Sequence, residues 1–66
     1  MYFTEIKKFR KAINYYRITM CVINMEHNIV LVADNYGDRY AAKLSDLSSD
    51  DRKQIDYFMS EFGEYE

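Results

Sequence analysis

The side chains that could do chemistry in this 66-residue chain are few and far apart. His27 is the single histidine and lies in a polar stretch, and the single cysteine, Cys21, is six residues away. A metal site needs several ligands that converge, and a reactive thiol needs a basic neighbour that lowers its pKa. Because the sequence supplies neither around these two residues, we expect a solvated histidine, a buried structural thiol, and no metal or other cofactor.

The carboxylates are numerous, but they do not follow a calcium-binding or catalytic pattern. The stretch Asp34-Asn35-Tyr36-Gly37-Asp38 has the residue types that open a calcium loop. Its glycine is fourth rather than sixth, however, and no glutamate stands at the twelfth position. An acid–base pair needs one carboxyl group in an apolar setting, and these carboxyl groups lie in polar stretches. We therefore predict that the protein is not an enzyme.

Charge is distributed unevenly along the chain, whose net charge is −2. The first 17 residues contain one acid, Glu5, and five basic residues: Lys7, Lys8, Arg10, Lys11 and Arg17. The remaining 49 residues contain four basic residues and ten acids. We therefore expect two surfaces of opposite charge, each suited to a different kind of partner.

The first two thirds of the chain are predicted to form one helix and three strands. Apolar residues at steps of three and four predict a helix over residues 3–16 with Thr4 as its N-cap. Its inner face is expected to hold Tyr2, Ile6, Phe9, Ile13 and Tyr16. Runs rich in β-branched residues predict strands over residues 17–25, 29–34 and 39–44, with turns between them that use Asn28 and Gly37.

A second helix is predicted over residues 49–62. Ser48 and Asp51 match a capping box, and Gly63 is well placed to end the helix. Its inner stripe is expected to contain Ile55, Phe58, Met59 and Phe62. The sequence thus predicts a single small α+β domain of order α-β-β-β-α, in which a three-stranded antiparallel sheet packs with two amphipathic helices.

This order of elements resembles that of double-stranded RNA-binding domains. Those domains place a basic, glycine-containing helix start where the RNA phosphates lie. The corresponding segment of this chain, Ser48-Ser49-Asp50-Asp51, is acidic. The resemblance therefore implies a shared architecture only, and we transfer no RNA-binding residue from it.

The leading functional hypothesis is binding of another protein through the second helix. If the inner stripe faces the core, Tyr57 points outward, with Asp50, Glu61 and Glu64 on its side. Exposed tyrosine among acids is typical of an interface. We predict a small accessory or inhibitory protein, of the type encoded by phages and mobile elements, that docks on a basic and nucleic-acid-binding groove. The expected contact residues are Asp50, Asp56, Tyr57, Glu61, Glu64 and Tyr65.

Three alternatives stay open. The first helix could bind nucleic acid through a basic and aromatic surface made of Lys7, Lys8, Arg10, Lys11 and Tyr15. Exposed aromatic residues could pair two copies in a structural homodimer, or both charged surfaces could be solvated helix faces without a partner.

The longest apolar run, residues 29–33, is too short to span a bilayer, and a lone cysteine fits a reducing compartment. We therefore expect a cytoplasmic protein that does not bind membranes.

Overall fold

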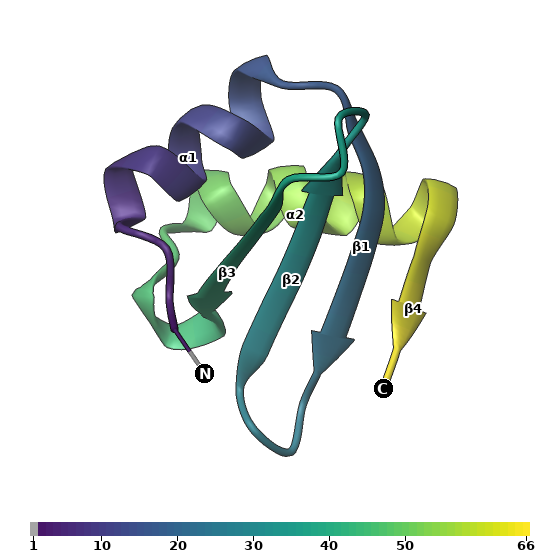
Figure 1. Cartoon of the computed structure of the whole chain (residues 1–66). Coiled ribbons are helices and arrows are strands. Elements are labelled where there is room, and N and C mark those ends of the chain that lie inside the picture. The colour runs from purple at the N-terminus through teal and green to yellow at the C-terminus, as the bar shows by residue number, and fades with distance from the viewer. Residues whose placement is uncertain (1) are drawn as a thin grey trace.

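The computed structural model describes residues 2–66, which form two helices packed against a four-stranded sheet (Figure 1). The strand order across the sheet is β3-β2-β1-β4. The predicted small α+β domain with two helices is therefore confirmed. In chain order, the elements are α1 (Ile6–Tyr15), β1 (Ile18–Asn24), β2 (Ile29–Asp34), β3 (Arg39–Lys43), a short 3-10 helix (Leu44–Asp46), α2 (Ser49–Phe62) and β4 (Gly63–Tyr65).

The sequence prediction missed the strand β4 and the 3-10 helix, and it assigned Leu44 to the third strand. β1, β2 and β3 pair in antiparallel fashion as expected, but β4 follows α2 and pairs in parallel with β1. The sheet is therefore mixed and four-stranded, and the predicted three-stranded antiparallel sheet is wrong in this respect. Gly63 ends α2 as predicted and also starts β4. A Cβ atom at Gly63 would collide with Cα and Sδ of Met59, so this turn requires glycine for space.

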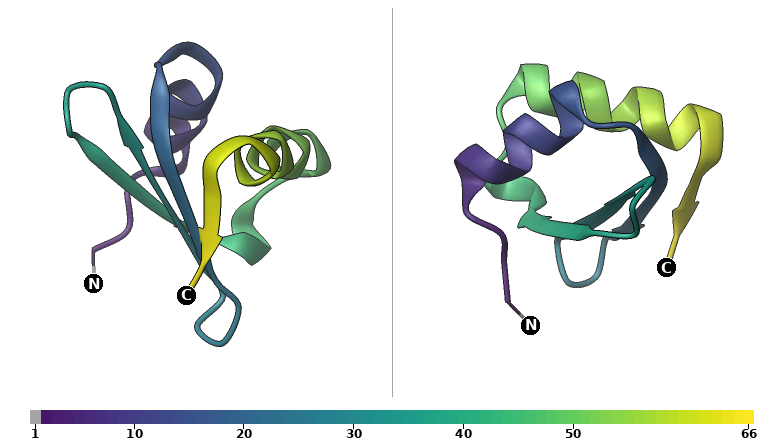
Figure 2. Two further views of the ribbon diagram at one scale, coloured as in Figure 1. Left: turned by 90° about the vertical axis from the view of Figure 1, so that its right-hand side faces the viewer. Right: turned by 45° about the horizontal axis from the view of Figure 1, so that its top comes forward.

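Both helices lie on the same face of the sheet, and no helix within residues 2–66 covers the other face (Figure 2). The core lies between the helices and the sheet. Its largest fully buried side chains come from both helices and from the two central strands: Phe9, Ile13, Cys21, Val30, Val32 and Ile55. Burying one such large aliphatic or aromatic side chain stabilises a fold by about 1.5–3 kcal/mol. Cys21 is buried as expected, and this burial raises the pKa of its thiol to about 11.

The helix α1 begins at Ile6, later than predicted, because the chain before it pairs with the edge of the sheet. The Thr4 N–H donates to the Ala41 carbonyl at 2.9 Å, and the Ala41 N–H donates to Thr4 Oγ1 at 3.0 Å. The prediction of Thr4 as the N-cap is therefore wrong, and Glu5 stands at the cap position without a side-chain hydrogen bond. Tyr2 is 99% exposed, and Tyr16 is 38% exposed and follows the end of α1, so the predicted places of both tyrosines on the inner face are also wrong.

The two turns of the β1-β2-β3 meander contain residues with positive φ. Asn28 has φ of 60° between β1 and β2, and Gly37 has φ of 87° between β2 and β3. Asparagine and glycine are the residue types that tolerate this backbone conformation. The expected roles of both residues are therefore confirmed.

The helix α2 begins and ends at the predicted residues. Ser48 Oγ accepts a hydrogen bond from the Asp51 N–H at 3.2 Å, and Asp51 Oδ2 accepts one from the Ser48 N–H at 3.1 Å. These reciprocal bonds form the predicted capping box. On the inner side, Ile55 and Phe58 are buried, whereas Phe62 is 38% exposed where the chain leaves the helix for β4.

Candidate functional site

The basic surface of α1 consists of Lys7, Lys8 and Lys11, which are all exposed, together with Tyr15, which is 82% exposed. Arg10 does not belong to this surface. Its Nε donates to Asp51 Oδ2 on α2 at 2.9 Å, so the guanidinium is held against the other helix. Of the residues predicted to contact nucleic acid, Arg10 is thus committed to an ion pair, while the three lysines and Tyr15 are accessible.

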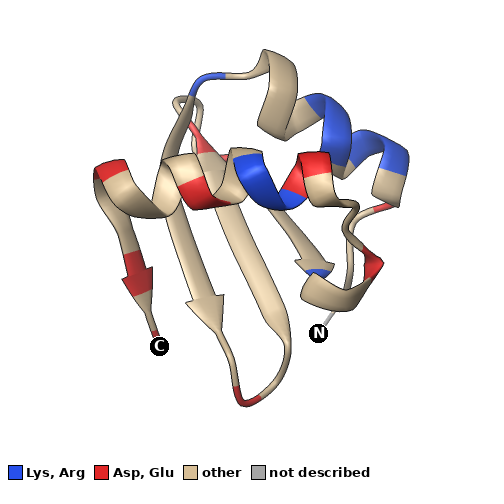
Figure 3. Cartoon of the chain, turned by 180° about the vertical axis from the view of Figure 1, so that it is seen from behind, with Lys and Arg blue, Asp and Glu red and all other residues tan. Residues whose placement is uncertain are grey.

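Asp51 joins the basic and acidic parts of the chain. Burial by itself would raise the pKa of this carboxyl group, but the hydrogen bonds from Arg10 and Ser48 outweigh burial and lower the pKa. The carboxylate therefore stays charged between α1 and α2. As Figure 3 shows, the basic residues of α1 lie next to the first half of α2 rather than on the opposite side of the molecule.

The outer face of α2 carries four of the residues predicted to contact a protein partner, all of them exposed: Asp50, Asp56, Tyr57 and Glu61. The ring of Tyr57 lies tilted against that of Phe58, with centroids 5.9 Å apart, so an exposed ring contacts a core ring directly. Lys53 is exposed on the same helix, and Figure 3 shows basic residues between the acids of α2. The surface is therefore acidic and aromatic, but it is interrupted by positive charge.

Glu64 and Tyr65 are separated from the outer face of α2. The sequence prediction placed Glu64 on the same helix side as Tyr57, and this placement is wrong because α2 ends at Phe62 and both residues belong to β4. They border a shallow hollow on the helix-free face of the sheet, beside side chains of β1 and β2. Any partner that contacts Tyr57 and Tyr65 together would have to reach around the end of α2.

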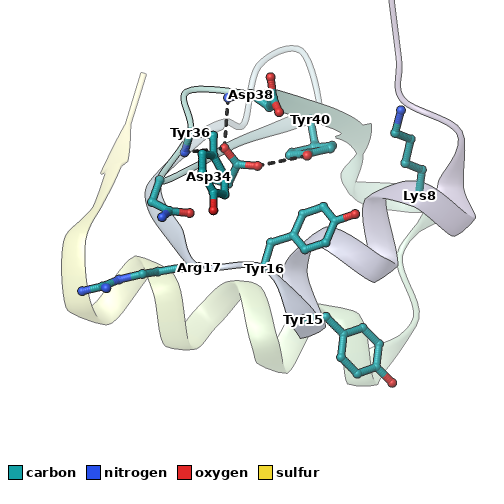
Figure 4. A pocket seen from close by; sticks show the side chains of 9 residues that line it. Lys8, Tyr15, Tyr16, Arg17, Asp34, Tyr36, Asp38 and Tyr40 are labelled. Atoms are coloured by element: carbon teal, nitrogen blue, oxygen red, sulfur yellow. Dashed lines mark hydrogen bonds between the residues drawn. The ribbon is translucent and has the colours of Figure 1, made fainter.

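The surface also has a pocket that the sequence analysis did not anticipate, with a volume of about 630 Å³. It lies between the end of α1 and the turn that joins β2 to β3 (Figure 4). We call it the tyrosine pocket, because four tyrosines line it together with charged residues of both signs: Tyr15, Tyr16, Tyr36, Tyr40, Lys8, Arg17, Asp34 and Asp38. Its size lies within the range of small-molecule sites, about 300–1,000 Å³.

Asp34 builds the inner wall of the tyrosine pocket. Its Oδ1 accepts hydrogen bonds from the N–H groups of Tyr36 at 2.9 Å and Asp38 at 3.0 Å, and its Oδ2 accepts one from the Tyr40 hydroxyl at 3.1 Å. Burial, followed by the hydrogen bond to this carboxylate, raises the pKa of Tyr40 to about 12. The Tyr16 ring packs at a tilt against the Tyr40 ring, with centroids 6.0 Å apart. Figure 4 shows the two rings side by side in the pocket lining. The pocket therefore offers tyrosine rings, charged side chains of both signs, and a carboxylate whose two oxygens already accept hydrogen bonds.

The sequence held only a partial signal for this pocket. The turn at residues 35–38 is readable, and Asp34 before it is the kind of residue whose side chain bonds to turn N–H groups. Lys8, Tyr15 and Tyr16 belong to a different element, and only the packing of α1 brings them to that turn. A pattern search along the chain cannot pair two such distant segments.

No three His, Cys, Asp or Glu side chains within residues 2–66 gather closely enough to hold a metal ion. Neither helix in that part of the chain has the length and apolar character of a membrane span. No protein-family model, curated protein or solved structure matches the chain significantly. Function must therefore be inferred from the geometry and chemistry of the basic surface of α1, the outer face of α2 and the tyrosine pocket.

Proposed function

We propose that this chain is a non-catalytic protein that docks the outer face of α2 on a basic surface of a partner protein. The observation that carries the proposal is the exposure of Tyr57. This residue is 56% exposed on α2, although the residue that follows it, Phe58, is buried in the core. Tyrosine supplies a large contact area at a low cost in conformational entropy. A tyrosine anchor that becomes buried can contribute more than about 2 kcal/mol of binding free energy, whereas acids at the rim mainly speed association.

The fold supports this use of α2, because its core-facing side and its outer side are occupied by different residues. Ile55 and Phe58 hold the helix on the sheet, and the capping box holds its first turn. The carboxylates of Asp50, Asp56 and Glu61 are spaced along the exposed side, where they can meet cations spaced along a phosphate-binding groove. Docking there would block the groove, so inhibition of the partner is part of the proposal.

The test uses a partner captured from the source cell and then purified, so that its affinity for variants can be measured. Tyr57→Ala should weaken binding about tenfold or more, mainly through faster dissociation. Glu61→Lys should slow association and reduce its dependence on salt. Tyr15→Ala and Glu26→Lys are matched controls, because they change the same residue types at exposed positions outside α2. Unchanged affinity of both α2 variants would exclude this surface.

A second candidate function is binding of single-stranded nucleic acid, favoured by one specific observation. Lys8 and Tyr15 belong to the basic surface of α1 and also line the tyrosine pocket. Phosphates could therefore follow the lysines while a base stacks on a pocket tyrosine, which is how many single-strand binders work. Three phosphate contacts would give a slope of about −2 for log affinity against log salt.

The nucleic-acid candidate is tested with fluorescent single-stranded DNA and RNA oligonucleotides at several salt concentrations. Charge reversal by Lys7→Glu with Lys11→Glu should abolish the change in fluorescence anisotropy. Lys53→Glu on α2 is the matched control and should leave binding intact. If the wild-type protein does not bind either oligonucleotide at low salt, this candidate is eliminated.

A further inference from the structure

The helix-free face of the sheet is apolar at its centre. The strand register places six side chains of the two central strands on this face: Met20, Val22, Asn24, Ile29, Leu31 and Ala33. All of them except Asn24 are apolar, and all except the buried Ala33 are partly exposed. A shallow hollow of about 300 Å³ lies over three of them, Met20, Val22 and Leu31. The hollow is bordered by Arg39 of β3 on one side and by Glu64 of β4 on the other.

The two edges of this face carry opposite charges. On β3, Arg39 pairs with Ala33 and Lys43 pairs with Ile29, so both basic side chains share the face of Leu31 and Ile29. On the opposite edge, Glu64 pairs with Val22 on the same face, and Glu66 borders the same hollow. Because the strand order is β3-β2-β1-β4, an apolar centre separates a basic edge from an acidic edge.

We propose that this face binds a second copy of the same chain, forming a homodimer of two stacked sheets. A two-fold axis that lies between the sheets and runs along the strands places β3 of each copy over β4 of the other. Arg39 and Lys43 then face Glu64 and Glu66 of the second copy at both ends of the interface. A two-fold axis across the strands would instead place β3 over β3, with like charges opposed. The charge pattern therefore selects the first arrangement.

This arrangement obeys the ordinary geometry of β-sandwiches and symmetric dimers. Facing sheets pack about 10 Å apart with their strands within about 30° of each other. A two-fold interface uses the same patch on both copies, and this patch is complementary to itself. Edge-to-edge pairing through β3 is disfavoured, because the Thr4–Ala41 hydrogen bonds already occupy the backbone there.

The dimer goes beyond the proposed docking function and does not depend on it. Both helices lie on the far side of each sheet, so α2 of each copy stays accessible in the dimer (Figure 2). A dimer would thus present two copies of Tyr57 on opposite outer surfaces. Failure of the dimer would leave a monomer with one docking surface, and failure of docking would leave the dimer intact.

Sedimentation velocity over a wide concentration range gives the first test. We expect wild-type protein to reach twice its chain mass of 8.0 kDa at high concentration. Leu31→Glu should weaken dimerisation at least about tenfold, because it buries a charge in the apolar centre of the interface. Lys53→Glu, on the far side of the molecule, should dimerise as the wild type does. A wild-type monomer at every concentration, or a dimer that resists Leu31→Glu, would overturn the proposal.

A charge-exchange experiment tests the orientation with variants that alter only surface side chains. Glu64→Arg alone and Arg39→Glu alone should each be largely monomeric, because each places like charges opposite one another in both halves of the interface. An equimolar mixture of the two variants should form a heterodimer, in which every facing pair is again of opposite charge. If the mixture stays monomeric while both variants keep the wild-type circular dichroism spectrum, the proposed axis is wrong.

Discussion

At the scale of single residues, Asp34 does two things with one carboxylate. It holds the β2–β3 turn through the N–H groups of Tyr36 and Asp38, and it fixes the Tyr40 hydroxyl in the wall of the tyrosine pocket. An asparagine at this position could not keep both sets of hydrogen bonds, because its side chain has a single acceptor oxygen where the carboxylate has two. We therefore expect the pocket and the turn to fail together when Asp34 is changed.

Tyr40 gives a prediction about stability at high pH. An ordinary tyrosine ionises near pH 10, but the pKa of Tyr40 in the fold is about 12. Between these values the unfolded chain releases the Tyr40 proton and the native protein keeps it, so the free energy of unfolding falls as pH rises. Tyr40→Phe should remove this part of the fall. The measurement is urea unfolding at pH 8 to 11.5, with the exposed Tyr36→Phe as the matched control.

Cys21 also lowers the free energy of unfolding as pH rises. Its thiol pKa is raised from 9.0 to about 11, so its contribution is lost over a lower pH range. Wild-type and Tyr40→Phe proteins both contain Cys21, and the difference between their slopes isolates the phenol. If Tyr40→Phe loses stability above pH 10 as steeply as the wild type, burial and the Asp34 hydrogen bond do not raise the pKa of Tyr40 in solution.

At the scale of elements, the contact between Arg10 and Asp51 ties α1 to the start of α2. Asp51 also completes the capping box with Ser48, so one carboxylate joins two helices and caps one of them. Exposed ion pairs usually contribute less than about 1 kcal/mol, and Arg10 is 44% exposed. The larger contribution of Asp51 therefore comes from the cap.

We predict that Asp51→Ala lowers the free energy of unfolding at pH 7 by about 1–2 kcal/mol, mainly through loss of the cap. Because the pKa of Asp51 is lowered in the fold, its contribution is present above the ordinary carboxyl pKa and is lost as pH falls below it. Thermal or urea unfolding at pH 7 and pH 3 tests both statements, with Asp50→Ala as the neighbouring control. An equal loss at both pH values would contradict the assigned charge state.

At the scale of the whole molecule, β4 is the last piece added to the sheet and one of its edges. It contains three residues and pairs with Cys21, Val22 and Ile23 of β1. Directly after β4, the Glu66 N–H donates a further hydrogen bond to the Ile23 carbonyl of β1 at 2.8 Å. Strands this short and terminal tend to open locally before the rest of a fold. Cys21 lies on β1, where it pairs with Gly63 of β4, and it is fully buried, so its thiol can report such opening.

We predict that deleting residues 63–66 increases the reaction rate of Cys21 with a disulfide reagent about tenfold or more at pH 8. In the intact protein the thiol is buried and its pKa is about 11, so reaction requires local opening. Glu64→Ala with Tyr65→Ala is the control, because it keeps the backbone pairing of β4 and should react slowly. If the deletion does not accelerate the reaction, β4 does not protect the strand beside it.

Local sequence patterns indicated both helices, the strands β1 to β3 and the turns between them, because these features depend on residues that are near one another in the chain. The three- and four-residue spacing around Ile55 and Phe58, the Ser48–Asp51 capping box, and the positive φ at Asn28 and Gly37 are all of this kind. For the same reason the acids and Tyr57 on the outer side of α2 could be predicted from helical spacing alone.

The tertiary structure alone decided the features that join distant segments. The parallel pairing of β4 with β1 has no signature in three residues, and Thr4 bonds to Ala41 because β3 offers a free edge nearby. The ion pair of Arg10, the tyrosine pocket and the opposite charges at the two sheet edges likewise depend on strand order and on how α1 packs. Such contacts follow from the burial of a shared core, and the spacing of residues along the chain does not encode them.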